Sequence, residues 1–259
     1  MNFKKIELVF IFVFFFLDLF LFFNFKQSTN VQTISEKETT VADTIDEMRK
    51  DNISIPKVSS KREQKGYLLS YSHVGGANSE GSDSNNSNLK QKTVILNTPL
   101  SLKKNKIEVL KKFVRNSHEV PNGKDYEYSD NLSSDKHIVF VQKFKENFFY
   151  DLNGQISFDI KDNIITDFKA SHIDSLIESK ETEAIISEED AVVKLYTLNE
   201  LPNNTRIIWQ KLAYSWMLEA NNVSVYVPTW FIAVQNKRTK SVTIEKINAF
   251  TGAPWKANF

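Results

Sequence analysis

The sequence predicts an α+β protein in which an N-terminal transmembrane helix precedes two units, each a helix followed by an antiparallel β-meander. Three observations lead to this prediction. There is one long apolar run near the N-terminus, there are two later segments with apolar residues at helical spacing, and alternating apolar and polar residues follow each of these segments. The predicted division is a cytoplasmic tail (1–5), a membrane anchor (6–26), a juxtamembrane helix (27–52), a first extracytoplasmic unit (53–176) and a second one (177–259).

The apolar run from Ile6 to Phe25 has the length and composition of a membrane-spanning helix. Seventeen of its 20 residues are apolar, and about 20 residues rising about 1.5 Å each cross the roughly 30 Å hydrocarbon core of a bilayer. Apolar residues gain about 0.3–0.6 kcal/mol each on insertion, and together they outweigh the roughly 2.5–3.5 kcal/mol cost of one central aspartate. The run is therefore predicted to insert.

The charges beside this run predict its orientation. Lys4 and Lys5 precede it, whereas only Lys26 follows closely, so the positive-inside rule places the N-terminus in the cytoplasm and the rest outside the cell membrane. A cleaved signal peptide is the alternative. Its apolar region is usually about 7–15 residues and is followed by a small-x-small site, which the sequence after Phe25 lacks. A retained single-pass anchor is the preferred interpretation.

Asp18 is the residue of the anchor that points to a partner, because an ionisable group at this depth usually faces another protein segment. Phe14, Phe15, Leu21 and Phe22 share its face of a helix. These five residues are predicted to dock on a transmembrane helix of a partner. The alternative is an aspartate that is protonated, or hydrated by water defects, in a helix that only anchors.

The outer part begins with a helix predicted over Glu36–Asp51, where Ser35 and Glu38 fit a capping box. A strand around Tyr67–Tyr71 is assigned to the first unit. The Gly/Ser/Asn-rich segment Gly75–Asn88 then has little to bury and is predicted to be a solvated loop.

Helical spacing of apolar residues predicts the next helix over Lys103–Asn116. The alternating segment His137–Phe144 is predicted to be a half-buried strand, and Asn153-Gly154 is predicted to form a tight primed turn with positive φ at both residues. The other strands expected in this unit are Thr93–Leu96 and the segment IITDFKASHID.

The second unit repeats this order of elements. Ser187 is predicted to cap a helix that ends near Leu198, with acidic residues in its first turn. Pro228 in the middle strand indicates an edge position or a bulge. The three strands expected after the helix are Arg206–Met217, Val223–Val234 and Val242–Phe250.

The composition argues against several classes of function. Lys+Arg 33 against Asp+Glu 32 lacks the basic excess of a nucleic-acid binder, and the absence of cysteine excludes disulfides and thiolate metal sites. The sequence has no H-E-x-x-H, G-x-S-x-G or G-x-x-x-x-G-K-S/T motif, and none of the four histidines pairs with another at metal-ligand spacing. No cofactor, metal or catalytic residue is therefore predicted. The aromatic residues of the second unit are predicted to be core residues, with a partner surface as the alternative: Trp209, Tyr214, Trp216, Tyr226, Trp230 and Trp255.

At its two ends the chain resembles the YycI (WalI) family of two-component-system regulators. At the start, Lys4-Lys5 precede a Phe/Leu/Ile-rich span with central Asp18, and Asn24-Phe25-Lys26 follow. Near the end, VPTWFIAV precedes a charged turn and INAFTG, Ile247 to Gly252. This closing strand and turn are also similar to PepSY-type and YycH-type modules, which implies a PepSY/YycH-like fold for the units.

The resemblance implies a non-enzymatic membrane regulator of cell-wall metabolism. Its partners would be a YycH-like membrane protein, a sensor histidine kinase of the WalK (YycG) type that signals to WalR, and membrane lipid. Two other interpretations remain from the residues. One is a PepSY-like envelope module that restrains a protease or binds a wall polymer. The other is an enzyme with an unrecognised site near Asp159 or Glu188, where Asp159 with Asp162 and Glu188 with Glu189 are the conceivable carboxylate pairs.

Overall fold

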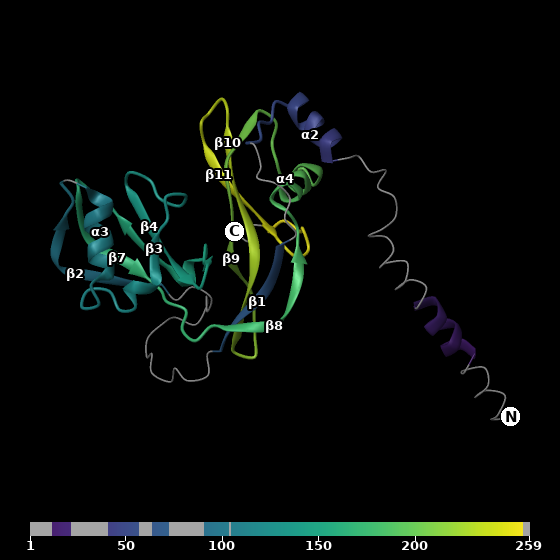
Figure 1. Cartoon of the computed structure of the whole chain (residues 1–259), viewed down its shortest axis with the longest axis horizontal. Coiled ribbons are helices and arrows are strands. Elements are labelled where there is room, and N and C mark those ends of the chain that lie inside the picture. The colour runs from purple at the N-terminus through teal and green to yellow at the C-terminus, as the bar shows by residue number, and fades with distance from the viewer. Residues whose placement is uncertain (1–11, 22–40, 57–63, 73–90, 104, 256–259) are drawn as a thin grey trace. The chain divides into compact units, whose positions relative to one another are not determined.

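The computed structural model describes residues 12–21, 41–56, 64–72, 91–103 and 105–255 (Figure 1). The chain forms two compact units, Met1–Glu47 and Met48–Phe259. Residues 12–21, in the unit Met1–Glu47, are helical. Helix α2 (Val41–Lys50) begins in this unit and ends in the unit Met48–Phe259. The helix predicted over Glu36–Asp51 is confirmed for these ten residues, and its predicted start lies outside the described residues.

The second unit contains two antiparallel sheets. In the five-stranded sheet, β10 is central: β9 pairs along one edge of it, while β1 and β11 share the other edge, and β8 pairs with β1. The bounds of these strands are β1 (Gln64–Ser72), β8 (Ile177–Ile185), β9 (Thr205–Ala220), β10 (Val223–Asn236) and β11 (Val242–Asn248).

The six-stranded sheet has the order β2-β7-β6-β4-β3, and β5 pairs with the end of β4. Helix α3 (Lys106–Arg115) packs on it, with Leu110 and Val114 in a core that also contains Phe140 and Phe158. The remaining bounds are β2 (Lys92–Ser101), β3 (Tyr126–Tyr128), β4 (His137–Phe144), β5 (Asn147–Phe148), β6 (Gln155–Asp159), β7 (Ile164–Ala170), and the 3-10 helices η1 (Gly123–Asp125) and η2 (Leu152–Gly154).

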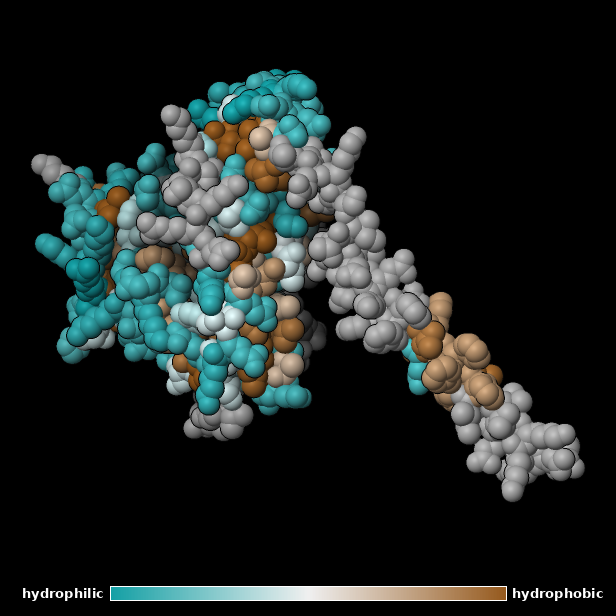
Figure 2. All heavy atoms as spheres, turned by 45° about the vertical axis from the view of Figure 1, so that its right-hand side comes forward, coloured by the Kyte–Doolittle hydropathy of each residue, from teal (hydrophilic) through white to brown (hydrophobic). Residues whose placement is uncertain are grey.

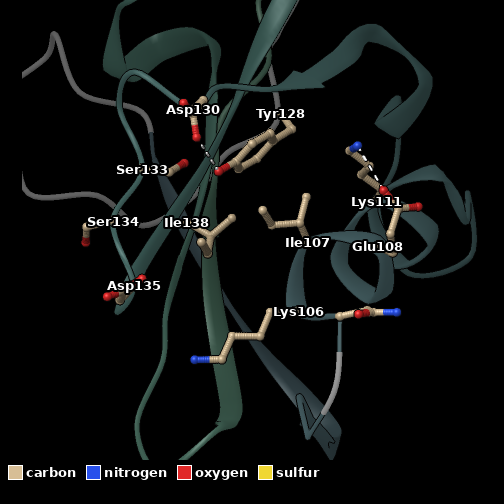
Figure 3. A pocket seen from close by; sticks show the side chains of 11 residues that line it. Lys106, Ile107, Glu108, Lys111, Tyr128, Asp130, Ser133, Ser134, Asp135 and Ile138 are labelled. Carbon is tan, nitrogen blue, oxygen red and sulfur yellow. Dashed lines mark hydrogen bonds and ion pairs between the residues drawn. The ribbon is translucent and has the colours of Figure 1, made fainter. Parts of the chain in front are cut away.

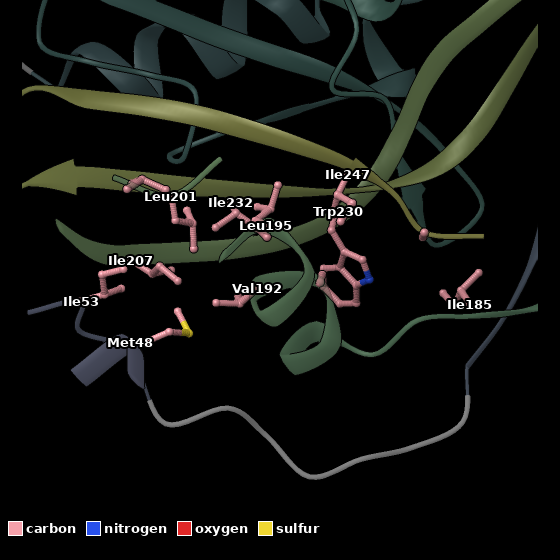
Figure 4. Packing of buried hydrophobic residues seen from close by; sticks show 13 residues of the cluster. Met48, Ile53, Ile185, Val192, Leu195, Leu201, Ile207, Trp230, Ile232 and Ile247 are labelled. Carbon is pink, nitrogen blue, oxygen red and sulfur yellow. The ribbon is translucent and has the colours of Figure 1, made fainter. Parts of the chain in front are cut away.

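Helix α4 (Glu188–Thr197) packs on the five-stranded sheet through Val192 and Leu195 (Figure 4). Trp230 lies in the same core and donates its indole N–H to the carbonyl oxygen of Ile186 at 3.0 Å. Met48, at the end of α2, also lies in this core. The predicted α+β class with antiparallel sheets is confirmed.

Ser187 caps α4 as predicted, because its hydroxyl oxygen accepts the backbone N–H of Asp190 at 3.0 Å. Replacing Ser187 with alanine is expected to lower the free energy of unfolding by about 1 kcal/mol, since one N–H of the first turn loses its partner. Urea unfolding of the full chain in detergent, followed by tryptophan fluorescence, measures this. Ser134→Ala, in an exposed loop, is the control and is expected to stay within about 0.5 kcal/mol of the parent. Equal losses in both variants would contradict the capping role.

Four local predictions differ from the structure. The strand around Tyr67–Tyr71 was predicted to belong to the unit 53–176. It is β1, which pairs with β10 and β8 and so belongs to the five-stranded sheet. Asn153 and Gly154 do not have positive φ; they form η2, in which the Asp151 carboxylate accepts the N–H of Asn153 at 3.0 Å. The two-residue turns with positive φ lie instead at Asp162-Asn163 and Asn221-Asn222.

The other two differences concern β4 and β10. β4 is buried on both faces rather than half-buried: Phe140 packs under α3, while Val139 and Val141 contact residues of the five-stranded sheet. Of the two alternatives predicted for Pro228, the edge is wrong, because β10 is central, and the register shift against β9 falls between Val225 and Tyr226, two residues before the proline. It lies between the residues of β10 that pair with β1 and those that pair with β11, so its missing N–H falls where neither of these strands is paired.

Candidate functional site

The sequence-predicted partner face lies on the helix of residues 12–21. Phe14, Phe15 and Leu21 are 60%, 58% and 54% exposed, and Asp18 is also exposed. The helix shows an almost entirely apolar surface in Figure 2. Residues three and four apart share a helix face, so Asp18 and these three residues lie on one face. Phe22, the fifth residue of the predicted face, is outside the described residues.

Among the described residues, no helix has both the length and the apolarity that crossing a membrane requires. The anchor predicted over residues 6–26 falls only partly within them, so the anchor and its partner face stay predictions.

The unit Met48–Phe259 has a core between its two sheets, formed by Leu69, Phe149, Ile173, Tyr214 and Tyr226. Phe149, which follows β5, is fully buried in it. Its ring lies 5.4 Å from that of Tyr226 and 5.7 Å from that of Tyr214, measured between centroids. The contact with Tyr226 is edge-to-face, an arrangement that adds stability beyond the area it buries. Phe149 follows a strand of the six-stranded sheet, and it therefore fills a core whose tyrosines belong to the five-stranded sheet.

Two hydrogen bonds to backbone groups of β9 extend this contact along the edge of β9 that does not pair with β10. The N–H of Tyr150 donates to the carbonyl oxygen of Tyr214 at 3.0 Å, and the Asp151 carboxylate accepts the N–H of Trp216 at 3.0 Å. These bonds satisfy groups that an edge strand would otherwise leave open.

Polar contacts lie beside the same inter-sheet core. Lys145 bonds Glu178 at 2.6 Å, and the hydroxyl of Tyr214 donates to the carbonyl oxygen of Tyr67 at 2.9 Å. The hydrogen bond from Lys145 lowers the pKa of Glu178. Burial, with the nearby Glu178 carboxylate, raises the pKa of Tyr67 to about 12, so this phenol stays neutral at physiological pH.

The segment 171–176, called the linker below, carries the chain from β7 to β8. The buried side chain of Gln142 binds the linker at Ile173 through both of its amide atoms, accepting the N–H at 2.9 Å and donating to the carbonyl oxygen at 2.7 Å. The imidazole of His172 lies between the carboxylates of Asp125 and Asp174. Sequence reasoning missed this cluster because Asp125 is 47 positions from His172, and no local spacing connects them.

An open pocket of about 660 Å³ lies between α3 and the loop after β3 (Figure 3). Ile107 and Ile138 lie beneath Tyr128, and Lys106 and Asp135 lie at the rim. Burial raises the pKa of Tyr128. Because both signs of charge line the pocket, it favours neither anions nor cations.

The conceivable catalytic carboxylates have ordinary structural surroundings. Asp159, at the end of β6, pairs with His137 at 2.7 Å, and Glu188 is in the first turn of α4, where burial raises its pKa. Asp162 has positive φ in the turn after β6. Within the described residues, no three histidine or acidic side chains are placed to hold a metal ion.

The aromatic residues of the predicted unit 177–259 belong mainly to the core, as predicted. Tyr214, Tyr226 and Trp230 are buried, and Trp209 and Trp216 pack against buried clusters.

The solved structures that are similar to this chain include the following two. One is an uncharacterized protein from Eubacterium rectale ATCC 33656, with 13% identity and a TM-score of 0.34, where the match covers 50% of this chain and 45% of that one. The other is the Bacillus megaterium YpeB C-terminal domain, with 16% identity and a TM-score of 0.38, where the match covers 58% of this chain and 61% of that one. Both TM-scores are below 0.5, so neither likeness bears on function. A search of the curated proteins finds no match.

The family described as YycI protein matches residues 29–250. This match covers most of the chain and includes both sheets. It confirms the predicted family, although the N-terminal residues 4–26 of the resemblance lie outside the match. YycI proteins are regulatory and non-catalytic, and they are associated with the WalK/YycG two-component system. This chain belongs to the YycI family.

Proposed function

We propose that this protein is a single-pass, membrane-anchored regulator of a WalK-like sensor histidine kinase and that it acts with a YycH-like membrane protein. Its N-terminus lies in the cytoplasm and the unit Met48–Phe259 lies outside the cell. The observation that carries the proposal is the YycI family match over residues 29–250. The kinase in turn controls cell-wall metabolism.

The N-terminal helix is the part we propose to contact the kinase within the membrane. Its described residues expose large apolar side chains on every side of the helix, which suits lipid and the apolar helices of a partner. Asp18 is the one ionisable group among them. A carboxyl group at membrane depth costs about 2.5–3.5 kcal/mol, and a hydrogen-bonding partner helix reduces that cost.

The regulation needs only a small difference in free energy. A kinase with two packing states of its transmembrane helices shifts toward the state that this helix binds more tightly, and about 1–3 kcal/mol changes the ratio of states by roughly 5- to 150-fold. We propose that the outer unit sets the position of the helix by binding the YycH-like protein.

Substituting Asp18→Leu is expected to weaken co-purification of the kinase from native membranes. A polar contact between transmembrane helices contributes about 1–2 kcal/mol, which corresponds to roughly a 5- to 30-fold change in association. Quantitative pull-down of the full-length protein, with the kinase measured by mass spectrometry, tests this. The matched control is Phe20→Leu, because Phe20 is 66% exposed on the other side of the helix from Asp18.

The expected result is loss of kinase with Asp18→Leu and retention with Phe20→Leu. Equal recovery from both variants would contradict the proposed face. A chimera in which an unrelated anchor replaces residues 1–26 separates the proposal from an outer module that acts alone. Kinase regulation should then be lost, whereas envelope binding or protease restraint by the outer unit should persist.

A further inference from the structure

His172 is held by one carboxylate at each of its ring nitrogens. Nε2 lies 2.9 Å from the Asp125 carboxylate in η1, and Nδ1 lies 2.8 Å from the Asp174 carboxylate in the linker itself. The imidazole is 19% exposed, while the two carboxylates are 51% and 63% exposed. The ring is thus enclosed at a place where both carboxylates still reach solvent.

The protonation state of the ring decides whether both bonds can form. An imidazolium has two N–H donors, whereas a neutral imidazole has one N–H and one bare nitrogen, and an ionised carboxylate can only accept. Both contacts are therefore satisfied only when His172 is protonated. When the ring is neutral, one of the two carboxylates faces a lone pair.

A second pair of groups suits the neutral ring. The side-chain nitrogen of Asn122 lies 3.3 Å from Nδ1, and that of Gln142 lies 3.4 Å from Nε2. Either amide can donate to a bare nitrogen, but at longer distances than the carboxylate contacts. Charge-assisted bonds are shorter and stronger than neutral ones, so the amide contacts replace only part of what deprotonation removes.

The remaining neighbour is neutral. The ring of Tyr126, in β3, lies 5.8 Å from that of His172, measured between centroids. Its buried hydroxyl donates to the carbonyl oxygen of Ser171, the first residue of the linker, and burial raises its pKa. Within the described residues, the ion pairs of His172 are with Asp125 and Asp174. The cluster therefore combines one imidazole with two carboxylates.

We propose that His172 is a pH-sensitive switch that fastens the linker to η1 when it is protonated and loosens it when it is neutral. Acid favours the protonated ring and so strengthens the attachment, whereas alkali favours the neutral ring and weakens it. Because the linker joins β7 to β8, the pH around the protein then changes how firmly the two sheets are coupled. This inference does not depend on the proposed partner of the N-terminal helix.

Hydrogen–deuterium exchange of the full-length protein in detergent micelles tests the switch. Exchange is compared at about pH 5 and pH 8, with labelling times adjusted for the intrinsic pH dependence of exchange. In the wild type, the opening equilibrium of the peptide that contains the linker is expected to rise about tenfold at the higher pH, relative to a peptide from β10, since one hydrogen bond to a charged group is lost.

His172→Gln keeps hydrogen-bonding capacity but cannot titrate, so its linker is expected to exchange equally at both pH values. His137→Gln is the matched control: His137 has one carboxylate partner, Asp159 at 2.7 Å, and its ring is 45% exposed. This control should keep the wild-type response. The proposal is overturned if the wild-type linker responds no more than β10, or if His172→Gln keeps the response. Should His172→Gln fail to fold, Asp125→Asn decides, because it leaves His172 titratable: a reduced response supports the switch and an undiminished one overturns it.

Discussion

Replacing Phe149 with alanine is expected to lower the free energy of unfolding by about 3–5 kcal/mol. The Phe149 side chain is fully buried and packs against Tyr214 and Tyr226. Alanine would leave a cavity lined by residues of the five-stranded sheet, whose backbone is held by pairing with its neighbours. The cavity can therefore collapse only in part, and the loss of contacts adds to the loss of apolar burial.

Urea unfolding of the full chain in detergent, followed by tryptophan fluorescence, measures this loss as a shift of the midpoint at an unchanged slope. Leu152→Ala is the control, because Leu152 lies three residues further along the chain and is 46% exposed. It is expected to change the free energy of unfolding by less than about 0.5 kcal/mol. A cost for Phe149→Ala no larger than the control's would show that the inter-sheet core does not stabilise the unit.

Replacing Gln142 with leucine is expected to cost about 2–6 kcal/mol, although the two side chains are similar in size. Gln142 is 3% exposed, and its amide satisfies both the N–H and the carbonyl oxygen of Ile173. Leucine would leave two buried backbone groups without partners, and each such group costs about 1–3 kcal/mol. The expected loss is larger than that of the Ser187 cap, where solvent can replace the missing partner.

The same substitution in the other sheet is a matched control. The side-chain nitrogen and oxygen of Gln210 are buried without a hydrogen-bond partner within the described residues. Gln210→Leu therefore removes two unsatisfied groups and is expected to be neutral or stabilising. Urea unfolding of both variants under identical conditions gives the comparison. If Gln142→Leu were as well tolerated as Gln210→Leu, the bidentate contact with Ile173 would not hold the linker.

Local chemistry accounts for the elements that could be predicted. α3 and α4 have apolar residues at helical spacing, and Ser187 supplies a cap whose bond runs to a residue three positions away. Asn221-Asn222 forms a turn with positive φ because asparagine tolerates that conformation. Asn153-Gly154 misled the same reasoning. There the carboxylate of Asp151 captures the N–H of Asn153 and stabilises a 3-10 turn in place of the primed turn.

The position of β1 could not be predicted in this way. A strand's alternating pattern shows that it has a buried face, but it does not show which strand it pairs with. β1 pairs with β10, whose residues are more than 150 positions later in the chain. The burial of both faces of β4 has the same origin, because Val139 and Val141 are covered by Phe231 and Ala213 of the other sheet.

The predicted partner face could be found from the sequence, whereas the contacts of His172 and Gln142 could not. Asp18 is noticeable in the sequence because a single charge in an apolar run is expensive wherever that run inserts. His172 and Gln142 are inconspicuous, since each is one of many polar residues, and their partners come from other elements of the fold.

Local patterns along the chain were enough to predict the α+β class, the α4 cap and the YycI family, because each of these depends on the spacing or identity of residues that are near one another in the sequence. The folded arrangement was needed to show that β1 joins the later sheet, that Phe149 fills the core between the sheets and that His172 lies between two carboxylates. These features depend on contacts between distant segments, which form because burying both sheets together stabilises the fold more than any local pattern does.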